Sequence, residues 1–517
     1  MKKTSFWSRL VFSITLFFLL SYLKIEGMIL LEDWIISVFC ISISFFFGPV
    51  LFLTTHIPLF ILAVADLHLK RMYQLSVFEA APWISMFILD ANVSEIQEYL
   101  PKISMAEYAL LACVPLFSAL VWFYHPQKKL SKPWYIIFWF AFLTSYLSHL
   151  YPTASVFLSS NGKNILNAHK EFKFNPSASE TAAHNVIIII GESHRYSEFH
   201  EAFQKYRKEF NDLYSFDNMI SLYANTMNSV PLILSRKKFQ NTSFYFPEKS
   251  LFSLFEEAGY KTYFLHYTDS SDITEKNNLT FIYRDANNFV NFSSKKDSLH
   301  DIRIYDALND ILTNDHHKKL IVIKMIGIHV DFRYRYPAAY DTRKPSLKKN
   351  IKKRTFGSKI QSLFEMPLSP KDREKVLNTY KNAMDYSVEI IRSLFDLVQK
   401  QPESSLAFFS SDHGICIFEK GTLLLPPNCK EAFHIPMMFN LNPELRKNTV
   451  PEKIKNLSCN TRKSLSQEYV FETIVSLAGI SYPTADKSFD LTAECIPDSG
   501  KRTVQKIPGD RSFYEDL

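Results

Sequence analysis

The sequence predicts two structural parts, a helical membrane domain over residues 1–150 and an α/β domain over residues 185–517, joined by a linker over residues 151–184. Three observations carry this prediction. Long apolar runs are concentrated before residue 150. The linker turns polar, with Ser, Asn, Lys and Ala replacing those runs. After it, short apolar runs alternate with helical patterns, and 517 residues are enough for two domains.

The first 150 residues contain enough apolar sequence for about five membrane-spanning helices. The first run offers no Ala-x-Ala-like cleavage site and is followed by more apolar segments, so it is expected to be a retained anchor rather than a signal peptide. The second run is too long for one span, and Gly48-Pro49 near its middle predicts a hairpin of two helices. The predicted spans are 6–23, two helices within 29–67, 105–124 and 134–150.

The placement of basic residues orients these spans. Five spans put both the Lys2-Lys3 end and the loop 127–132 on the inner side, as the positive-inside rule requires. The α/β domain is then periplasmic. Its four cysteines are an even number suited to an oxidising compartment. Three pairings are possible, and sequence proximity favours Cys416 with Cys429 and Cys459 with Cys495.

The α/β domain is predicted to be a mostly parallel sheet with helices on both faces, because strands and helices alternate along the chain. The expected strands are 185–190, 261–266, 320–326 and 405–410, and the helical stretches include 246–258 and 370–400.

Polar residues follow two of these strands at the point where each strand ends. Gly191 and Glu192 follow the first, and Asp412 and His413 follow the last. Ligands bind beyond the carboxyl ends of strands in such sheets, and carboxylate and imidazole groups are zinc ligands. Thr226, in a polar segment that enters a helix, would add a hydroxyl that a divalent cation can convert into a nucleophile. Taken alone, each piece is more typical of a turn or a helix cap; the combination predicts a metal site.

These segments resemble motifs of the phosphoethanolamine transferases of Gram-negative envelopes, which include the lipid A modifying enzymes of polymyxin resistance. The matching segments are Gly191-Glu192-Ser193, Thr226-Met-Asn-Ser229-Val230-Pro231, Ser411-Asp412-His413-Gly414, the stretch from Met325 to His329 with Arg335-Tyr336-Pro337, and the helix around Tyr380. The resemblance implies a sulfatase-like domain of the alkaline phosphatase superfamily and a multi-pass protein of the bacterial inner membrane. It also implies Zn²⁺ held by Glu192, Thr226, Asp412 and His413, with one ion expected and a second left open.

The same resemblance suggests roles for three further residues. His329 is expected to contact the substrate phosphate or a second metal. Glu95 is expected to contact the donor headgroup, with an unspecific interfacial helix as the alternative. His434 is either a substrate contact or a structural residue. Two positions depart from the family, because Ile415 replaces an acid and the stretch around Leu425 lacks a histidine.

The implied reaction moves phosphoethanolamine from phosphatidylethanolamine to Thr226, and then to lipopolysaccharide (lipid A or core) or another envelope glycan. The alternatives are a phosphoglycerol transferase of the same superfamily and a catalytically silent envelope scaffold. Ser193 is a rival nucleophile, although a Gly-x-Ser-x-Gly elbow is absent. A sulfatase would need a Cys/Ser-x-Pro-x-Arg motif, which is also absent.

The charge is modestly basic, with a formal net charge of +7 and a cluster of cations over residues 343–354. Near a membrane such a cluster would attract anionic lipid, and it can equally be a solvated insertion. Nucleic acid is not an expected partner of a periplasmic segment, and the chain is expected to be a monomer.

Overall fold

The computed structural model describes residues 171–240, 248–266, 282–283, 285–292, 301–330, 332–348, 369–421, 423, 427–497, 501–507 and 510–517. The chain divides into two compact units, and all of the described residues belong to one of them. The five predicted spans and Glu95 lie outside the described residues. Within the described ranges, no helix is both long enough and apolar enough to cross a bilayer.

A seven-stranded sheet forms the centre of this unit, with the order β3-β9-β8-β2-β7-β5-β6. The pairs β2–β7, β2–β8, β5–β7 and β5–β6 are parallel, whereas β9 is antiparallel to both β8 and β3. The predicted, mostly parallel sheet is therefore confirmed. The strands are β2 (Asn185–Gly191), β3 (Leu213–Phe216), β5 (Lys261–His266), β6 (Asn288–Asn291), β7 (Lys319–Lys324), β8 (Ser405–Ser411) and β9 (Met437–Leu441).

The central strands form because their β-branched and aromatic side chains can be buried on both faces of a sheet that helices cover. All seven residues of β2 and of β8 are buried. Successive side chains point to opposite faces, so Val186, Ile188 and Ile190 pack into one large core cluster, which Ile187 does not join. β7 ends at Lys324, two residues before its predicted end. The amide of Met325 still donates to Ile190 of β2 (3.0 Å), but the amides of Ile326 and Gly327 donate to the Asp301 carboxylate instead of a neighbouring strand.

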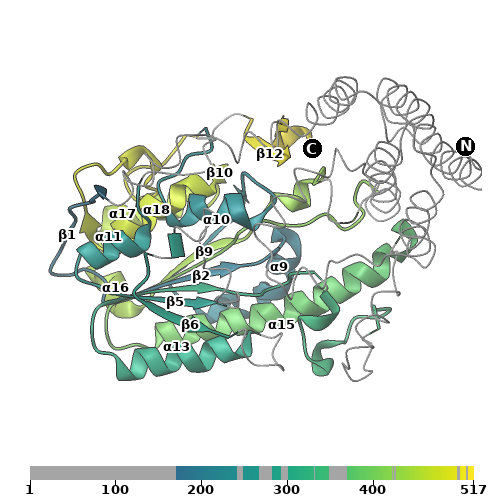
Figure 1. The fold of residues 1–517 in the computed structure, drawn as a ribbon, viewed down its shortest axis with the longest axis horizontal. Coiled ribbons are helices and arrows are strands. Elements are labelled where there is room, and N and C mark those ends of the chain that lie inside the picture. Colours follow the sequence, from purple (N-terminus) through teal and green to yellow (C-terminus); the bar gives the residue numbers. More distant parts are fainter. Residues whose placement is uncertain are drawn as a thin grey trace, which may run out of the picture. The chain divides into compact units, whose positions relative to one another are not determined.

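Helices cover both faces of the sheet (Figure 1). α10, α11 and α18 contribute apolar residues to the same core cluster as Val186, Ile188 and Ile190. α13 and α15 lie on the opposite face in Figure 1. The α-helices are α9 (Tyr196–Phe203), α10 (Thr226–Leu234), α11 (Leu251–Glu257), α13 (Ile302–Asn314), α15 (Arg373–Gln399), α16 (Pro443–Asn448), α17 (Pro451–Asn460) and α18 (Val470–Leu477).

Short elements complete the described part of the chain. Ser177–Ala178 (β1) pairs with Ile480–Ser481 (β11), and Phe174 is buried, so the end of the segment expected to be a linker packs on this unit. The remaining strands are β4 (Met219–Ile220), β10 (Leu465–Ser466), β12 (Thr503–Ile507) and β13 (Asp510–Phe513). The 3₁₀ turns are η1 (Gln204–Glu209), η2 (Phe332–Tyr334), η3 (Ala338–Tyr340), η4 (Pro370–Asp372), η5 (Lys430–Ala432), η6 (Gln467–Tyr469), η7 (Lys487–Phe489) and η8 (Tyr514–Asp516).

Both favoured cysteine pairs are confirmed. Cys416 is bonded to Cys429, and Cys459 is bonded to Cys495.

Candidate metal centre

Sheet register brings the acidic residues of the site together. Gly191 at the end of β2 is aligned with Ser411 at the end of β8, and the two strands are adjacent and parallel. The next residue of each strand, Glu192 and Asp412, therefore leaves the sheet at the same edge. The amide of Asp412 donates to the carbonyl of Gly191 (3.1 Å), which holds the two turns against each other.

Thr226 reaches this edge from the first turn of α10. Asn225 caps that helix, since its side-chain oxygen accepts a hydrogen bond from the amide of Asn228 (3.0 Å). The Thr226 hydroxyl lies 2.8 Å from Asp412 Oδ2 and 3.0 Å from Glu192 Oε2. It also lies 3.4 Å from His413 Nε2. The four residues predicted as metal ligands thus converge on one point.

His413 presents the nitrogen that a metal requires. Its Nδ1 lies 2.7 Å from the carbonyl oxygen of Gly414, which can only accept a hydrogen bond. Nδ1 therefore carries the proton in the neutral ring, and the lone pair of Nε2 faces the carboxylates. Nε2 is 3.4 Å from Glu192 Oε1 and 3.7 Å from Asp412 Oδ2.

These separations suit a small divalent cation. Zinc binds nitrogen and oxygen at about 2.0–2.1 Å, so neighbouring ligands of a tetrahedral site lie about 3.3 Å apart. The five side-chain distances given above among Thr226, Glu192, Asp412 and His413 range from 2.8 to 3.7 Å. Glu192, Asp412 and His413 form a group of buried residues whose ligand atoms lie within 4.8 Å of one another. The chemistry of the donors and their spacing both fit zinc.

Backbone groups fix the orientation of Asp412. Its Oδ1 accepts from the amides of Ser193 (3.1 Å) and His413 (2.7 Å), which leaves Oδ2 pointing at Thr226. Gln467 in η6 donates to the carbonyl oxygens of Ser411 (3.1 Å) and Asp412 (2.7 Å). A carboxylate held in this way needs little reorganisation when it binds a cation.

Lys324 is a member of the site that the sequence analysis missed. It is the last residue of β7, the strand adjacent to β2 on the side opposite β8. Its Nζ lies 2.6 Å from Glu192 Oε2 and 3.1 Å from Asp412 Oδ2. Part of the signal was present, because Lys324 lies near the carboxyl end of the strand expected over 320–326, and parallel strands bring their carboxyl ends to one edge of the sheet.

Burial and charge together set the pKa values of these groups. Burial is the largest influence on Glu192 and opposes its ionisation, but Lys324, His413, His329 and the hydrogen bond with Asp412 together outweigh burial. They hold the pKa of Glu192 well below its usual range. For Asp412, burial and the negative charge of Glu192 raise the pKa. Burial disfavours the charge on Lys324, but Asp412 and Glu192 outweigh it, so the pKa of Lys324 is raised. The ammonium of Lys324 therefore favours the ionised form of both carboxylates.

His329 lies in the loop after β7, next to Ile328, whose amide donates to the carbonyl of Glu192 (3.0 Å). The Nδ1 of His329 is 3.0 Å from the carbonyl of Val330. Burial lowers its pKa to about 4, and the charge of Glu192 acts in the opposite direction. Gly327 shapes this loop, because its φ is +51° and a Cβ there would come within 2.8 Å of the Glu192 amide nitrogen. The His329 loop thus packs directly on Glu192.

Of the remaining predicted residues, His434 contacts other parts of the fold, whereas Ser193 contacts two of the four converging ligands. His434 Nε2 donates to the carbonyl of Asp217 (3.0 Å), and its ring stacks on Tyr196. Both contacts are with residues outside the candidate metal ligands. Ser193 is buried and its hydroxyl donates to Glu192 Oε1 (2.8 Å). Ile415 is buried, and Leu425 lies outside the described residues.

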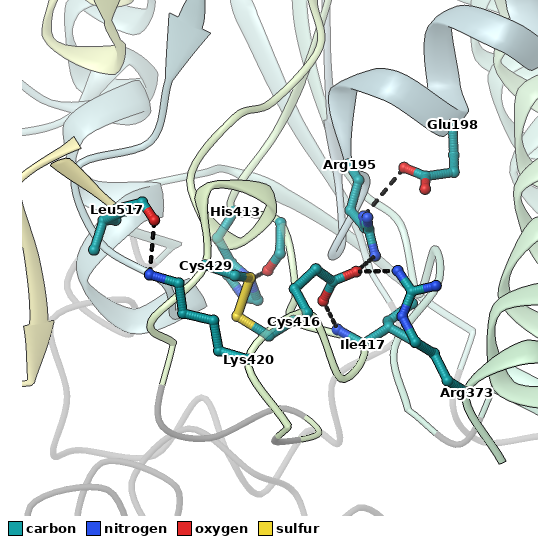
Figure 2. Close-up of a disulfide and its surroundings, with 11 residues drawn as sticks. Arg195, Glu198, Arg373, His413, Cys416, Ile417, Lys420, Cys429 and Leu517 are labelled. Carbon is teal, nitrogen blue, oxygen red and sulfur yellow. Dashed lines mark hydrogen bonds and ion pairs between the residues drawn. A yellow bond between two sulfur atoms is a disulfide. The ribbon is translucent and has the colours of Figure 1, made fainter. Parts of the chain in front are cut away.

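The loop after His413 is anchored at several points (Figure 2). Figure 2 shows the Cys416–Cys429 disulfide beside His413, with Arg195 and Arg373 approaching from the helices. Both guanidinium groups pair with Glu419 Oε1, at 3.0 Å and 3.3 Å. The disulfide closes a loop whose first residue lies three positions after His413, so it holds the chain that orients this ligand.

Removing this disulfide should weaken both the fold and the metal site. In the full-length chain, Cys416→Ser with Cys429→Ser is expected to lower the free energy of unfolding by roughly 3 kcal/mol, the size expected for so short a loop. All six tryptophans precede residue 140, so unfolding of this domain should be followed by pulse proteolysis in urea.

The matched control is Cys459→Ser with Cys495→Ser, which opens the other disulfide. This variant should also lower stability, since the Cys459–Cys495 disulfide closes a longer loop, between cysteines 36 positions apart. It should leave zinc affinity unchanged. Equal loss of zinc from both double variants would contradict a specific role for the Cys416–Cys429 loop.

The fold is a mostly parallel sheet with helices on both faces. The candidate metal ligands and a hydroxyl lie beyond the carboxyl ends of its strands, the usual ligand site of open-sheet α/β proteins. The chain belongs to the Sulfatase family, whose family model matches residues 184–480. It is similar to phosphoethanolamine transferase EptC of Escherichia coli strain K12, with 22% identity over 403 residues. The match covers 73% of this chain and 63% of that protein, so less than two thirds of the relative is spanned.

Two solved structures share the fold. The C-terminal periplasmic domain of EcEptC from Escherichia coli, in complex with Zn, has 17% identity and a TM-score of 0.55, covering 66% of this chain and 96% of that one. The integral membrane protein lipooligosaccharide phosphoethanolamine transferase A (EptA) from Neisseria meningitidis has 15% identity and a TM-score of 0.61, covering 95% and 98%. The predicted sulfatase-like α/β domain is confirmed, as is the family resemblance found in the motifs.

Proposed function

We propose that this chain is a zinc-dependent phosphoethanolamine transferase that uses Thr226 as its nucleophile. The observation that carries the proposal is the position of the Thr226 hydroxyl, within 3.4 Å of Glu192, Asp412 and His413 together. A hydroxyl at the start of a helix, against two carboxylates and an imidazole lone pair, is positioned for deprotonation. The similarity to a protein named phosphoethanolamine transferase supports the choice of group transferred.

The residues of the site have two roles: some would bind the cation, and others keep the nucleophile and its partners in position. Glu192, Asp412 and His413 would bind zinc through Oε, Oδ2 and Nε2, with Thr226 Oγ1 as the fourth ligand. Zinc bound there would lower the pKa of the hydroxyl and offset the charge of the phosphoryl group. Asn225 keeps Thr226 at the first position of α10, and the backbone amides of Ser193 and His413 keep Asp412 in place. His329 is proposed to contact the phosphate.

The transfer takes place in two steps. Thr226 Oγ1 attacks the phosphorus of phosphatidylethanolamine, the phosphorus–oxygen bond to glycerol breaks, and the departing oxygen takes up a proton to leave as diacylglycerol. An acceptor oxygen then attacks the same phosphorus and the bond to Thr226 breaks. The proton lost by the acceptor restores the Thr226 hydroxyl.

The proposed donor is a membrane lipid, so a membrane domain would keep the enzyme close to its substrate. We infer about five spans within residues 1–150, a linker that reaches the first residues of the sheet, and a catalytic domain on the periplasmic side of the bacterial inner membrane. Such an arrangement would hold the active site against the leaflet that supplies the donor. The similarity to the integral membrane protein EptA supports this arrangement.

The acceptor is proposed to be lipopolysaccharide, through lipid A or the core. The name of EptA includes lipooligosaccharide, which supports this class of acceptor. The chain is proposed to act as a monomer on these membrane substrates. Family membership does not imply a sulfate ester as substrate, because the Cys/Ser-x-Pro-x-Arg segment expected of a sulfatase is absent.

The decisive experiment is peptide mass spectrometry of the purified full-length protein after incubation with phosphatidylethanolamine. A phosphoethanolamine adduct on the peptide containing Thr226 is expected. Phosphatidylglycerol should be offered in parallel, because an adduct from that lipid alone would replace the proposed donor. An adduct on Ser193 would instead identify the rival nucleophile, and absence of any adduct in a zinc-loaded protein would overturn the proposal.

A further inference from the structure

Lys324 holds a fixed positive charge at the two carboxylate oxygens that also face Thr226. Its Nζ lies 2.6 Å from Glu192 Oε2 and 3.1 Å from Asp412 Oδ2. The Thr226 hydroxyl lies 3.0 Å and 2.8 Å from the same two atoms. The ammonium group and the nucleophile therefore share both partners, so a phosphoryl group bonded to Thr226 Oγ1 would form near the ammonium.

The ligands at this site are sufficient for one ion. Within the described ranges, the ligand residues grouped at this edge of the sheet are Glu192, Asp412 and His413. With Thr226 they complete a tetrahedral zinc site. Asp412 Oδ1 already accepts two backbone amides, and Glu192 Oε1 accepts the Ser193 hydroxyl. A further divalent ion would have to share Glu192 Oε2 and Asp412 Oδ2 with both the first ion and Lys324.

Charge balance favours a single divalent ion accompanied by an ammonium group. Two carboxylates and one zinc ion sum to zero, so the Thr226 alkoxide would add an unbalanced negative charge to a buried site. Lys324 supplies the matching positive charge. A second zinc in addition to Lys324 would leave the same site with an excess of three positive charges before Thr226 ionises.

We propose that Lys324 takes the place of a second metal ion, so that the chain binds one zinc ion and stabilises the phosphoryl group with the ammonium of Lys324. This inference rests on the proposed function and adds to it the number of ions and a further catalytic residue.

The test compares Lys324→Met with the wild-type full-length chain. Zinc per chain is measured by elemental analysis, zinc affinity by competition with a chromophoric chelator, and adduct formation by mass spectrometry. One zinc per chain is expected for the wild type. Loss of the like charge should tighten zinc binding in Lys324→Met by at least about tenfold. The rate of adduct formation on Thr226 should fall by roughly 100-fold or more, as when a charge-stabilising donor is removed.

Two further variants serve as controls. Lys319→Met removes the other buried lysine of β7, which lies at the opposite end of the strand and donates to Asn185 Oδ1 (3.2 Å). It should change neither zinc affinity nor the rate of adduct formation. Lys324→Arg keeps the charge, and its zinc affinity should stay within about threefold of the wild type.

Tighter zinc binding together with slower adduct formation in Lys324→Met distinguishes a catalytic role of Lys324 from a purely structural one. If Lys324 only held the carboxylates in place, Lys324→Met would bind zinc more weakly, and the proposal would be wrong. Two tightly bound zinc ions in the wild type would overturn it without any variant. A wild type that forms the Thr226 adduct, with Lys324→Met behaving identically, would refute only the role of Lys324. A wild type that binds no zinc would refute the proposed function as well.

Discussion

Replacing Thr226 by alanine is expected to abolish the phosphoethanolamine adduct and to slow transfer by at least about 10,000-fold, the scale seen when a covalent nucleophile is removed. The physical reason is that no other described hydroxyl lies against both Glu192 Oε2 and Asp412 Oδ2. Transfer should be measured with a fluorescent phosphatidylethanolamine, following release of diacylglycerol by the full-length protein.

Folding should survive this substitution. Thr226 is half-buried at the first position of α10, where alanine is compatible with the helix, and the Asn225 cap is untouched. The matched control is Thr226→Ser, which keeps the hydroxyl and should retain measurable transfer and the adduct. If Thr226→Ala transferred at the wild-type rate, the covalent route through Thr226 would be refuted.

The largest structural effect is expected from Gly414→Ala. A Cβ at this position would lie 1.9 Å from the carbonyl oxygen of Glu431, which is backbone and cannot swing aside. The two segments are held together by hydrogen bonds from the Gly414 amide to Ala432 (2.9 Å) and from the Ile415 amide to Glu431 (3.2 Å). Separating them should cost at least about 4 kcal/mol of stability. Because the Gly414 carbonyl also orients His413, zinc affinity should fall together with stability.

Pulse proteolysis in urea provides the measurement for Gly414→Ala. Gly259→Ala is the matched control, since Gly259 has a φ of +85° but no atom within 4 Å of the added Cβ. It should lose only about 1 kcal/mol, the cost of a left-handed backbone conformation for alanine. A loss at Gly414 no greater than that at Gly259 would show that the loop relaxes around the added methyl group.

The sequence contained enough information for the sheet and for the convergence of four residues. The run of β-branched residues before Glu192 and the apolar run before Asp412 each predict a buried strand, and polar residues at strand ends are expected at one edge. Thr226 was found because a polar segment precedes a helix. In each case the signal is local, a change from apolar to polar side chains at the end of one element.

Residues that depend on the approach of distant segments were predicted less completely. Lys324 was missed because the strand was expected to continue to residue 326 and its neighbours in the sheet were unknown. His434 remained open between two roles, and the stacking on Tyr196 required the fold. The importance of Gly414 lies in its contact with Glu431, seventeen residues away, which no local pattern reports.

By itself, the sequence determined the α/β class of the described domain, the favoured disulfide pairs and the identities of the candidate ligands, because these follow from hydrophobic patterning and residue chemistry along short segments. Tertiary structure alone decided that β7 lies next to β2, and hence that the ammonium of Lys324 meets Glu192 and Asp412. The physical reason is that strand order is set by how all the elements pack around one core, whereas the charge balance of a site depends on distances between residues that the chain keeps far apart.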